Sequence, residues 1–391
     1  MSEIGVGVIG TGFMGECHAL AFAAVGPVFQ PRLRPRLEMV ADIDQAAAER
    51  AKHRFGFARS VGDWQALVAD PAVGLITITT PNLLHKPMAL AAIAAGKHVY
   101  CEKPLAMSVA DARELALAAA AAGVRTLVGY NYLRPPAIRH IKHLLDSGEL
   151  GHLTYLRAAF EEDYMADPAV PFSWRCERAK AGLGALGDLG SHAVSVARHL
   201  GGPIVEVLAD LAVVVPTRAV APAGAEAGQF ARVDEGSEAA QRAVENEDVA
   251  HALVRFRSGV LGTITASRVA WGRKNGPDLD LHASRGAVRF RQERFNEFEL
   301  FRADPRKDDN GFRTVLTGPY HPGYDRFSPA PGHGLGFNDL KTIEVAHLLD
   351  GIDRGTPLDP DFREGWAIEA VCEAMVASAE RRAWVRVEQP G

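Results

Sequence analysis

The chain has 391 residues, of which 47% are hydrophobic, and a formal net charge of -5. This length is enough for two domains with sizeable cores, and the mild acidity gives no reason to expect nucleic acid as a partner. An apolar strand-type run begins at Ile4 with no basic segment before it, and the longest apolar helix, around 115–124, is too short to span a bilayer. We therefore expect a cytoplasmic protein without a membrane partner.

The four cysteines, Cys17, Cys101, Cys176 and Cys372, lie far apart and form no CxxC pair. Neither a disulfide framework nor a zinc knuckle is indicated by such spacing. The sequence predicts no metal site.

A glycine loop stands between a short apolar strand at 4–9 and a helix at 13–25. Gly10 can make the tight turn, Gly12 lets the backbone approach a pyrophosphate, and Gly15 allows close packing of helix and strand. The N-H groups at the helix start would face the phosphate charge. This context predicts a dinucleotide site that includes Phe13 and Met14, the alternative being an ordinary glycine-rich turn.

A second strand at 37–42 ends in Asp42, where a Rossmann fold places the carboxylate that accepts hydrogen bonds from the adenosine ribose. Its charge would repel a 2'-phosphate, so Asp42 favours NAD over NADP. The segment 27–36, rich in Pro and Arg, resembles an insertion before this strand, and a basic loop there could still reach a phosphate. Asp42 could instead cap the following helix.

Strands at 75–79, 98–101 and 126–130 alternate with helices at 84–95 and 109–122. This alternation is typical of a doubly wound parallel sheet. We expect an NAD-binding Rossmann domain over residues 1–130.

The alternation of strands and helices ends after residue 130, where a helix at 137–147 is followed by longer strands. Short glycine-containing turns join several of them, which favours an antiparallel sheet. The expected strands are 152–161, 205–215, 248–257, 260–269, 278–283, 287–292 and 297–302, and helices at 338–354 and 364–381 close the chain. Residues 131–391 are therefore expected to form an α+β domain with one large, mainly antiparallel open sheet.

Two segments lack periodicity. We expect 216–241, rich in Ala, Gly and Glu, to be an exposed connection. The segment 307–338 mixes Gly and Pro with Tyr and His, and is either a loop over a site or a plain surface loop.

Three residues offer the chemistry of an alcohol oxidation. Lys103 follows a parallel strand, at the sheet edge where ligands of such folds bind, although a loop lysine is usually only solvated. Asp188 and His192 are four residues apart and share a face if a helix begins near Asp188. The competing account is that Asp188 caps a helix and His192 is structural.

The motifs Gly10–Gly15, Thr80–His85, Glu102–Pro104 and Gly184–His192 resemble the Gfo/Idh/MocA family, the glucose-fructose oxidoreductase and inositol dehydrogenase group. The resemblance covers nearly the whole chain. Further stretches at 162–168, 173–175 and 244–248 resemble the subgroup of scyllo-inositol, L-glucose and levoglucosan dehydrogenases.

By this resemblance Lys103, Asp188 and His192 match the catalytic positions, with His192 as general base. The resemblance also implies a cis bond between Lys103 and Pro104 and a tetramer or dimer formed through the exposed face of the large sheet. The family often has an Arg two residues after the Asn of Gly-Tyr-Asn, whereas here Arg134 stands one residue later, which leaves its role open. Residues expected near the cofactor are Thr80, Asn82, His85, Glu102, Lys103, Asn131, Trp174 and Arg175, and those expected to bind substrate are Lys103, Asp163, Arg175, Asp188, His192 and His333.

The expected activity is NAD-dependent oxidation of a secondary or anomeric ring hydroxyl of a cyclic polyol or sugar, such as scyllo-inositol, L-glucose or a related pyranose, to the ketone or lactone. His192 would take the hydroxyl proton, and the Lys103 cation would stabilise the alkoxide character on oxygen. Alternatives are a levoglucosan-type anhydrosugar 3-dehydrogenase, an NAD-assisted glycosidase and a non-catalytic sugar or NAD sensor.

Overall fold

The computed structural model describes residues 2–221, 232–233 and 239–390, which form two compact units. Of the described residues, unit 1 contains 2–134, 318–369 and 390, and unit 2 contains 135–221, 232–233, 239–317 and 370–389. No helix among the described residues is long and apolar enough to cross a membrane.

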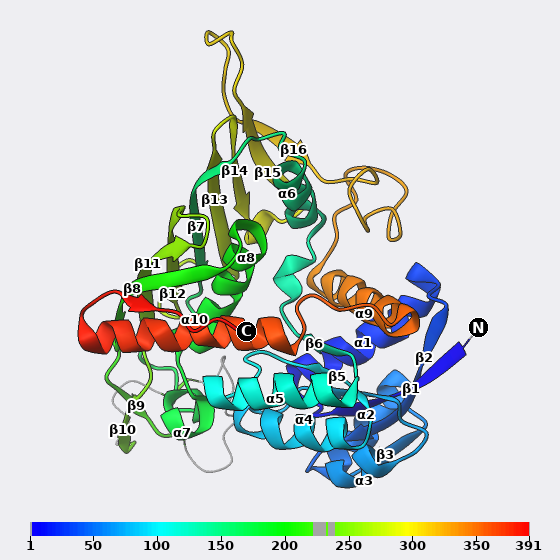
Figure 1. Ribbon diagram of the computed structural model, residues 1–391. Coiled ribbons are helices and arrows are strands. Elements are labelled where there is room, and N and C mark those ends of the chain that lie inside the picture. Colours follow the sequence, from blue (N-terminus) through cyan, green and yellow to red (C-terminus); the bar gives the residue numbers. More distant parts are fainter. Residues whose placement is uncertain (1, 222–231, 234–238, 391) are drawn as a thin grey trace. The chain divides into compact units, whose positions relative to one another are not determined.

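Unit 1 is built on a six-stranded parallel sheet with the strand order β3-β2-β1-β4-β5-β6 (Figure 1). Because the strand order reverses between β1 and β4 and crossovers are right-handed, the helices that follow β1 and β2 lie on one face of the sheet, and those that follow β4 and β5 lie on the other. The strands are β1 (Ser2–Ile9), β2 (Leu33–Ala41), β3 (Arg59–Val61), β4 (Leu75–Ile78), β5 (His98–Cys101) and β6 (Thr126–Val128). The helices are α1 (Phe13–Phe29), α2 (Gln45–Phe55), α3 (Trp64–Ala69), α4 (His85–Ala94), α5 (Val109–Ala122) and α9 (Phe337–Arg354).

Helix α9 comes from the far end of the chain and packs beside α1. Val345, Leu348 and Leu349 of α9 are fully buried in one apolar cluster with Val6 of β1 and Phe22 of α1. Burial of such side chains contributes roughly 1.5–3 kcal/mol each. The C-terminal part of the chain therefore completes the core of the parallel-sheet unit.

Unit 2 contains a nine-stranded mixed sheet with the order β16-β15-β14-β13-β7-β12-β11-β8-β17. Only the neighbours β7 and β12 run parallel, so the expectation of one large, mainly antiparallel sheet is confirmed. The strands are β7 (Leu153–Glu161), β8 (Ile204–Ala212), β11 (Val249–Phe256), β12 (Leu261–Ser267), β13 (Gly276–Ala283), β14 (Gly286–Arg291), β15 (Glu297–Arg302), β16 (Arg313–Leu316) and β17 (Val385–Arg386).

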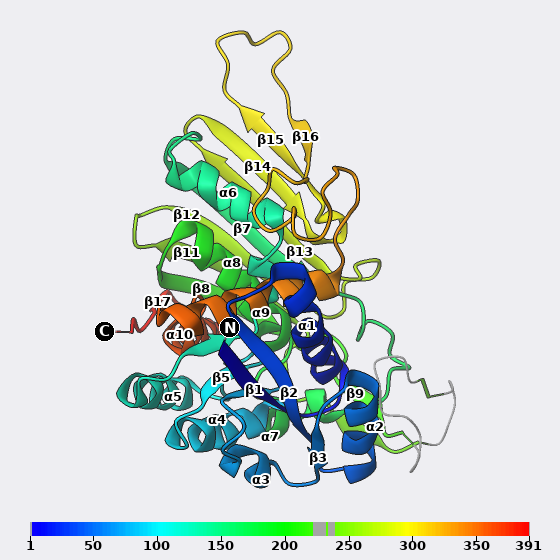
Figure 2. The same ribbon diagram turned by 90° about the vertical axis from the view of Figure 1, so that its right-hand side faces the viewer.

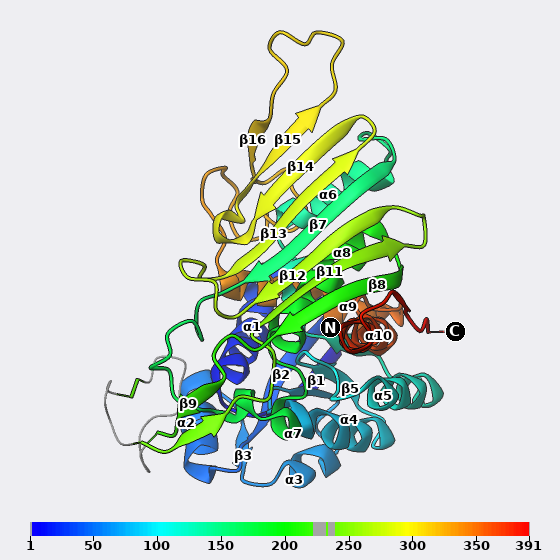
Figure 3. The same cartoon turned by 90° about the vertical axis from the view of Figure 1, so that its left-hand side faces the viewer.

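Helices α6 (Pro136–Asp146) and α8 (Ser191–Gly201) cover one face of this sheet (Figure 2). In Figure 3 the strands lie in front of these two helices, and neither helix covers that side of the sheet. Two short strands, β9 (Thr217–Ala219) and β10 (Gln241–Ala243), pair separately, and α7 spans Arg178–Ala181. Helix α10 (Phe362–Arg381) begins in unit 1 and ends in unit 2.

The sequence predicted connecting segments at 27–36 and 216–241. Residues 27–36 are not an inserted loop, because α1 continues through Pro27 to Phe29 and β2 begins at Leu33. Pro27 removes one backbone hydrogen-bond donor from α1, but the helix continues past it. Within the connection expected at 216–241, the described residues include β9 and the first residue of β10, and most of the connection lies outside the described residues.

Candidate active site

The glycine loop of unit 1 has the shape that a dinucleotide pyrophosphate needs. Gly10 follows β1 with φ of +99°, and a Cβ on Gly15 would lie 2.1 Å from the Gly10 carbonyl oxygen, so both positions require glycine. A Cβ on Gly12 would meet nothing within 4 Å. Gly12 is the N-cap of α1 and has no side-chain capping bond. An anion at this helix start would therefore fit without steric conflict.

Asp42 follows β2, beside the glycine loop. Its Oδ2 accepts hydrogen bonds from the backbone N of Thr11 at 2.9 Å and from Thr11 Oγ1 at 2.6 Å. The helix cap is a different residue, Asp44, whose carboxylate accepts from Ala46 N at 2.9 Å. The capping alternative for Asp42 is thus excluded. Sequence reasoning gave Thr11 no role, although its position inside the loop was a usable signal.

His85 connects the segment after β4 to the turn after β5. Its ring is buried, with Nδ1 at 2.7 Å from the Pro104 carbonyl oxygen and Nε2 at 2.9 Å from that of Thr80. Burial lowers the pKa of His85, which favours a neutral ring that donates to one carbonyl. Of the other residues expected at the cofactor, Phe13 is 72% exposed, Asn82 is half-buried and Asn131 is buried.

Lys103 is the second residue after β5 and is half-buried. The Lys103–Pro104 bond is cis, as expected. The side chain of Glu102 is buried and its carboxylate bonds to His18 and Lys341, so a contact of Glu102 with the cofactor would have to be made by its backbone. Arg134, whose role the sequence left open, is buried and lies 3.7 Å from the Glu344 carboxylate.

Asp188 and His192 belong to unit 2, on one continuous helical segment. Residues Leu186–Gly190 form a π-helical turn that runs directly into α8, a local geometry that is frequent at functional sites. His192 is 4% exposed, and its ring centroid lies 5.5 Å from that of Phe160 on β7. The helix expected near Asp188 is therefore present, with a π turn as its start.

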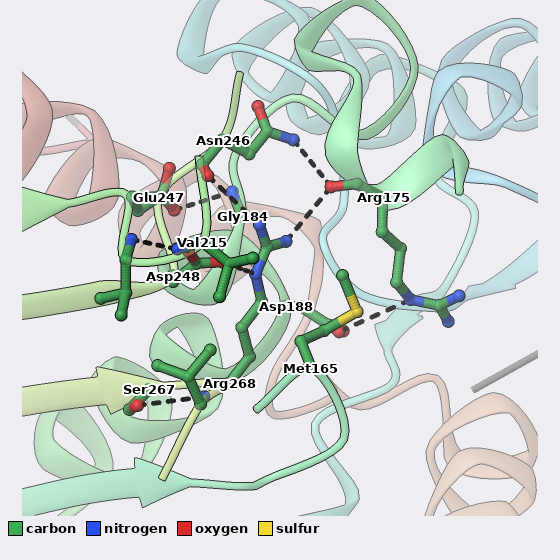
Figure 4. Close-up of polar contacts among 12 residues, drawn as sticks. Met165, Arg175, Gly184, Asp188, Val215, Asn246, Glu247, Asp248, Ser267 and Arg268 are labelled. Atoms are coloured by element: carbon green, nitrogen blue, oxygen red, sulfur yellow. Dashed lines mark hydrogen bonds and ion pairs between the residues drawn. The ribbon is translucent and has the colours of Figure 1, made fainter. Parts of the chain in front are cut away.

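Tyr164 and Arg175 both contact the Asp188 carboxylate. The Tyr164 hydroxyl donates to its Oδ2 at 2.8 Å. Arg175 Nε lies 3.9 Å from the same oxygen, a contact that Figure 4 shows. Burial and the neighbouring Asp188 charge raise the pKa of Tyr164 well above its ordinary value, so the phenol stays protonated and donates. Tyr164 stands in a stretch that carried the family resemblance, but the sequence alone gave it no function.

Arg175 is fixed through its backbone. Its carbonyl oxygen accepts from Asn246 Nδ2 at 3.0 Å and from Arg268 at 3.2 Å. Arg268 is 1% exposed and bonds to the Asp248 carboxylate at 2.8 Å (Figure 4). The guanidinium of Arg175 lies 4.6 Å above the ring of Trp174. In the sequence, the stretch 244–248 contributes only to the family resemblance. In the structure its residues help to fix the backbone of Arg175.

Glu247 fixes the start of the segment that carries Asp188. Its Oε1 accepts from the backbone N of Gly184 at 2.7 Å and of Leu186 at 2.9 Å. A Cβ on Gly184 would lie 2.1 Å from the Glu247 carbonyl oxygen, so this close approach requires glycine. Burial raises the pKa of Glu247.

The two remaining expected substrate residues lie in different units. Asp163 Oδ2 in unit 2 accepts from Lys274 Nζ at 2.7 Å and from Gly272 N at 3.1 Å. The hydrogen bond from Lys274 lowers the pKa of Asp163, so its carboxylate is ionised. His333 in unit 1 is exposed, and its carbonyl oxygen accepts from the buried Tyr324 hydroxyl.

Two family domains match this chain. Residues 4–130 match the oxidoreductase family with an NAD-binding Rossmann fold, and residues 138–289 match the GFO/IDH/MocA C-terminal domain. The chain belongs to the Gfo/Idh/MocA family. It is an NAD-dependent oxidoreductase, and the glycine loop described above fits that cofactor.

Similar proteins extend over the whole chain. A levoglucosan dehydrogenase from Pseudarthrobacter phenanthrenivorans is 36% identical over 390 residues, covering 100% of this chain and 99% of the relative. A levoglucosan dehydrogenase structure in complex with NADH and levoglucosan has 34% identity and a TM-score of 0.92, with 100% of both chains covered. An NAD-binding oxidoreductase structure from Klebsiella pneumoniae has 40% identity and a TM-score of 0.92, also with full coverage.

Proposed function

We propose that this protein oxidises a secondary or anomeric ring hydroxyl of a cyclic polyol or sugar to the ketone or lactone. The observation that carries the proposal is the similarity to a levoglucosan dehydrogenase along both units, at 36% identity over 390 residues. Within this class an anhydropyranose such as levoglucosan is the first compound to test, followed by L-glucose and scyllo-inositol.

We infer that His192 is the general base. Its Nδ1 is buried, so Nε2 is the nitrogen that we propose takes the hydroxyl proton. The ammonium of Lys103 stabilises the negative charge that develops on the substrate oxygen. Bound NAD+ supplies the hydride acceptor.

Asp188 orients the imidazole or holds a second substrate hydroxyl. The Tyr164 hydroxyl and the nearby Arg175 limit the positions of its carboxylate, which supports an orienting role. Arg175, Asp163 and His333 are the proposed partners of further substrate hydroxyls. Because the Asp163 carboxylate already accepts from Lys274, a sugar hydroxyl there would share that oxygen or use Oδ1.

The test is a panel of levoglucosan, L-glucose, scyllo-inositol and related pyranoses, with NAD+ as co-substrate and NADH absorbance as the signal. The product is identified in parallel by mass spectrometry. One NADH per molecule of ketone or lactone supports a dehydrogenase. Sugar release without net NADH would instead indicate an NAD-assisted glycosidase, and binding without turnover would indicate a sensor.

We also propose that the protein assembles as a homotetramer or dimer through the sheet face that α6 and α8 leave uncovered (Figure 3). A shallow depression in the sheet is lined by Tyr155, Arg157, His251, Thr263 and neighbouring residues. Leu253 and Leu261 are each 49% exposed, and burying them against a second copy would be favourable. Light scattering during size-exclusion chromatography gives the mass, and Leu253→Arg should reduce it.

The proposed compartment is the cytoplasm. All four cysteines are buried and none is in a disulfide, which suits a reducing compartment where NAD+ is also present.

A further inference from the structure

Lys341, on α9 of unit 1, is a fully buried lysine with 0% exposure. Its ammonium lies 2.7 Å from Glu102 Oε1, 3.1 Å from Glu344 Oε2 and 3.1 Å from the Tyr100 hydroxyl. A buried charge is costly unless it is paired and hydrogen-bonded, and here three partners surround it. No reaction step proposed above uses Lys341.

The charge states of this cluster follow from its contacts. Burial alone would lower the pKa of Lys341, but Glu102 and Glu344 outweigh it and raise the pKa. Burial alone would raise the pKa of Glu102, but Lys341 and His18 hold it well below its ordinary value. Lys341 is therefore a cation and Glu102 an anion across the neutral pH range.

His18 completes the shell around Glu102. Burial, followed by the charge of Lys341, lowers the pKa of His18, so its ring is neutral. An ionised carboxylate can only accept, so Nε2 carries the proton and donates to Glu102 Oε1 at 2.8 Å, while Nδ1 accepts from the Thr77 hydroxyl. Lys341 and His18 thus both donate to one oxygen of Glu102.

Glu102 immediately precedes Lys103. Its second oxygen lies 3.3 Å from the backbone N of Lys103. A Cβ on Gly129 would lie 2.6 Å from Glu102 Oε1, so the carboxylate occupies space that only glycine leaves open at that position. Lys341 therefore fixes a carboxylate whose place is also set by the neighbouring backbone.

The residues that follow Lys103 are also held by hydrogen bonds. The Pro104 carbonyl oxygen lies 2.7 Å from His85 Nδ1, and the backbone N of Leu105 donates to Glu369 Oε1 at 3.0 Å. Because Pro104 and Leu105 are held, the anchoring of Glu102 determines how the remaining residue of the turn, Lys103, leaves the end of β5.

We propose that Lys341 is a positioning residue for Lys103. It fixes the ionised Glu102 and so sets the backbone from which the catalytic ammonium extends. The inference rests on the proposed function, in which Lys103 stabilises charge on the substrate oxygen. Displacement of a catalytic group by about 1 Å can cost roughly 10²-fold in rate.

The test compares Lys341→Met with Arg354→Met, which also removes one cation from α9. Arg354 is a suitable control because its side chain is 65% exposed and pairs with Asp350 one helical turn away. At a temperature well below the midpoint of unfolding, Lys341→Met should lower kcat by about 10- to 100-fold. The Kd for NADH, measured by fluorescence, should stay within about twofold, because the glycine loop and Asp42 are unchanged. Arg354→Met should have the same kcat and the same Kd for NADH as the wild type.

A double-mutant cycle with Lys103→Ala separates positioning from a general structural role. If Lys341 acts through Lys103, Lys341→Met should change kcat by less than about twofold when Lys103 is already Ala. An equal loss in both backgrounds, a wild-type kcat for Lys341→Met, or weakened NADH binding would each overturn the inference. If Lys103→Ala itself keeps wild-type kcat, the proposed role of Lys103 fails instead.

Lys341→Met removes the ammonium that pairs with the buried carboxylates of Glu102 and Glu344, a change that can prevent folding. In that case the cycle is run with Lys341→Met/Glu344→Gln, which removes one charge of each sign and keeps Glu102. The Gln oxygen can still accept from the Tyr100 hydroxyl. The same loss of kcat, dependent on Lys103, is expected, and a wild-type kcat in this variant would refute the positioning role.

Discussion

The Tyr164 hydroxyl donates a hydrogen bond of 2.8 Å to the same Asp188 oxygen that lies 3.9 Å from Arg175 Nε. This bond limits the directions in which the carboxylate can point. Tyr164→Phe removes only the hydroxyl, and we expect kcat to fall by about 3- to 10-fold because a bond to a charged group is lost. Steady-state kinetics measure the effect. Tyr155→Phe, which removes a hydroxyl from the open sheet face, is the control, and an equal loss there would argue against a specific role for Tyr164.

Asp42 should make NAD+ strongly preferred over NADP+, because a 2'-phosphate beside its carboxylate would be repelled. Asp42→Ala should lower the ratio of kcat/KM for NAD+ to kcat/KM for NADP+, mainly by admitting NADP+. The variant should not become a good NADP+ enzyme, since removing a repulsive group does not build a phosphate site. Asp44→Ala is the matched control: it removes the cap of α2, at a cost of about 0.5–2 kcal/mol in stability, and should leave the cofactor ratio unchanged. Equal kcat/KM for the two cofactors in the wild type would contradict the assignment.

The buried pair of Glu102 and Lys341 predicts a specific acid sensitivity. The folded-state pKa of Glu102 lies well below its ordinary value, so its contribution to stability is complete above the ordinary glutamate pKa of about 4.3 and is lost as the pH falls further. Glu102→Gln keeps an oxygen that can accept from Lys341 and His18 but loses the charge. The difference in Tm between wild type and variant should therefore stay constant from pH 7 to about 5 and shrink as the pH falls from about 5 to about 3. A difference that stays constant down to about pH 3 would show that Glu102 is not ionised in the folded protein.

The pH dependence of the reaction tests the base. His192 accepts a proton only when it is neutral, so kcat should rise with pH to a plateau. A nearby carboxylate favours the imidazolium, so Asp188→Asn should move this rise to lower pH. A profile whose midpoint is the same in both proteins would show that Asp188 does not act on His192.

Local patterns predicted most elements of the fold. The strand at 98–101 and the helix at 109–122 agree with β5 and α5 because their signals, an apolar run and an alanine-rich segment between a serine cap and a glycine, are contained in the element itself. The segment at 27–36 misled, because Pro27 and Pro35 suggested a loop whereas tertiary packing keeps helix and strand intact.

Some residues of the candidate site could be recognised from local sequence patterns, and others are brought together only by tertiary packing. Gly10, Asp42 and Lys103 were accessible from the sequence because each stands next to its own strand. The role of Lys341 was not accessible, since 239 residues separate it from Glu102 and only the packing of α9 in unit 1 brings them together. Tyr164 is 24 residues from Asp188, and nothing in its local pattern indicates that bond.

The central claim is that His192 takes the hydroxyl proton when the ring carbon is oxidised. The most direct test is kcat for NADH formation by His192→Ala at saturating NAD+ with the best substrate of the panel, compared with the wild type. The account predicts a fall of about 10²- to 10⁴-fold, the usual contribution of a general base, with the Kd for NADH almost unchanged. A wild-type kcat with an unaltered pH profile would contradict it and would make His192 a structural residue.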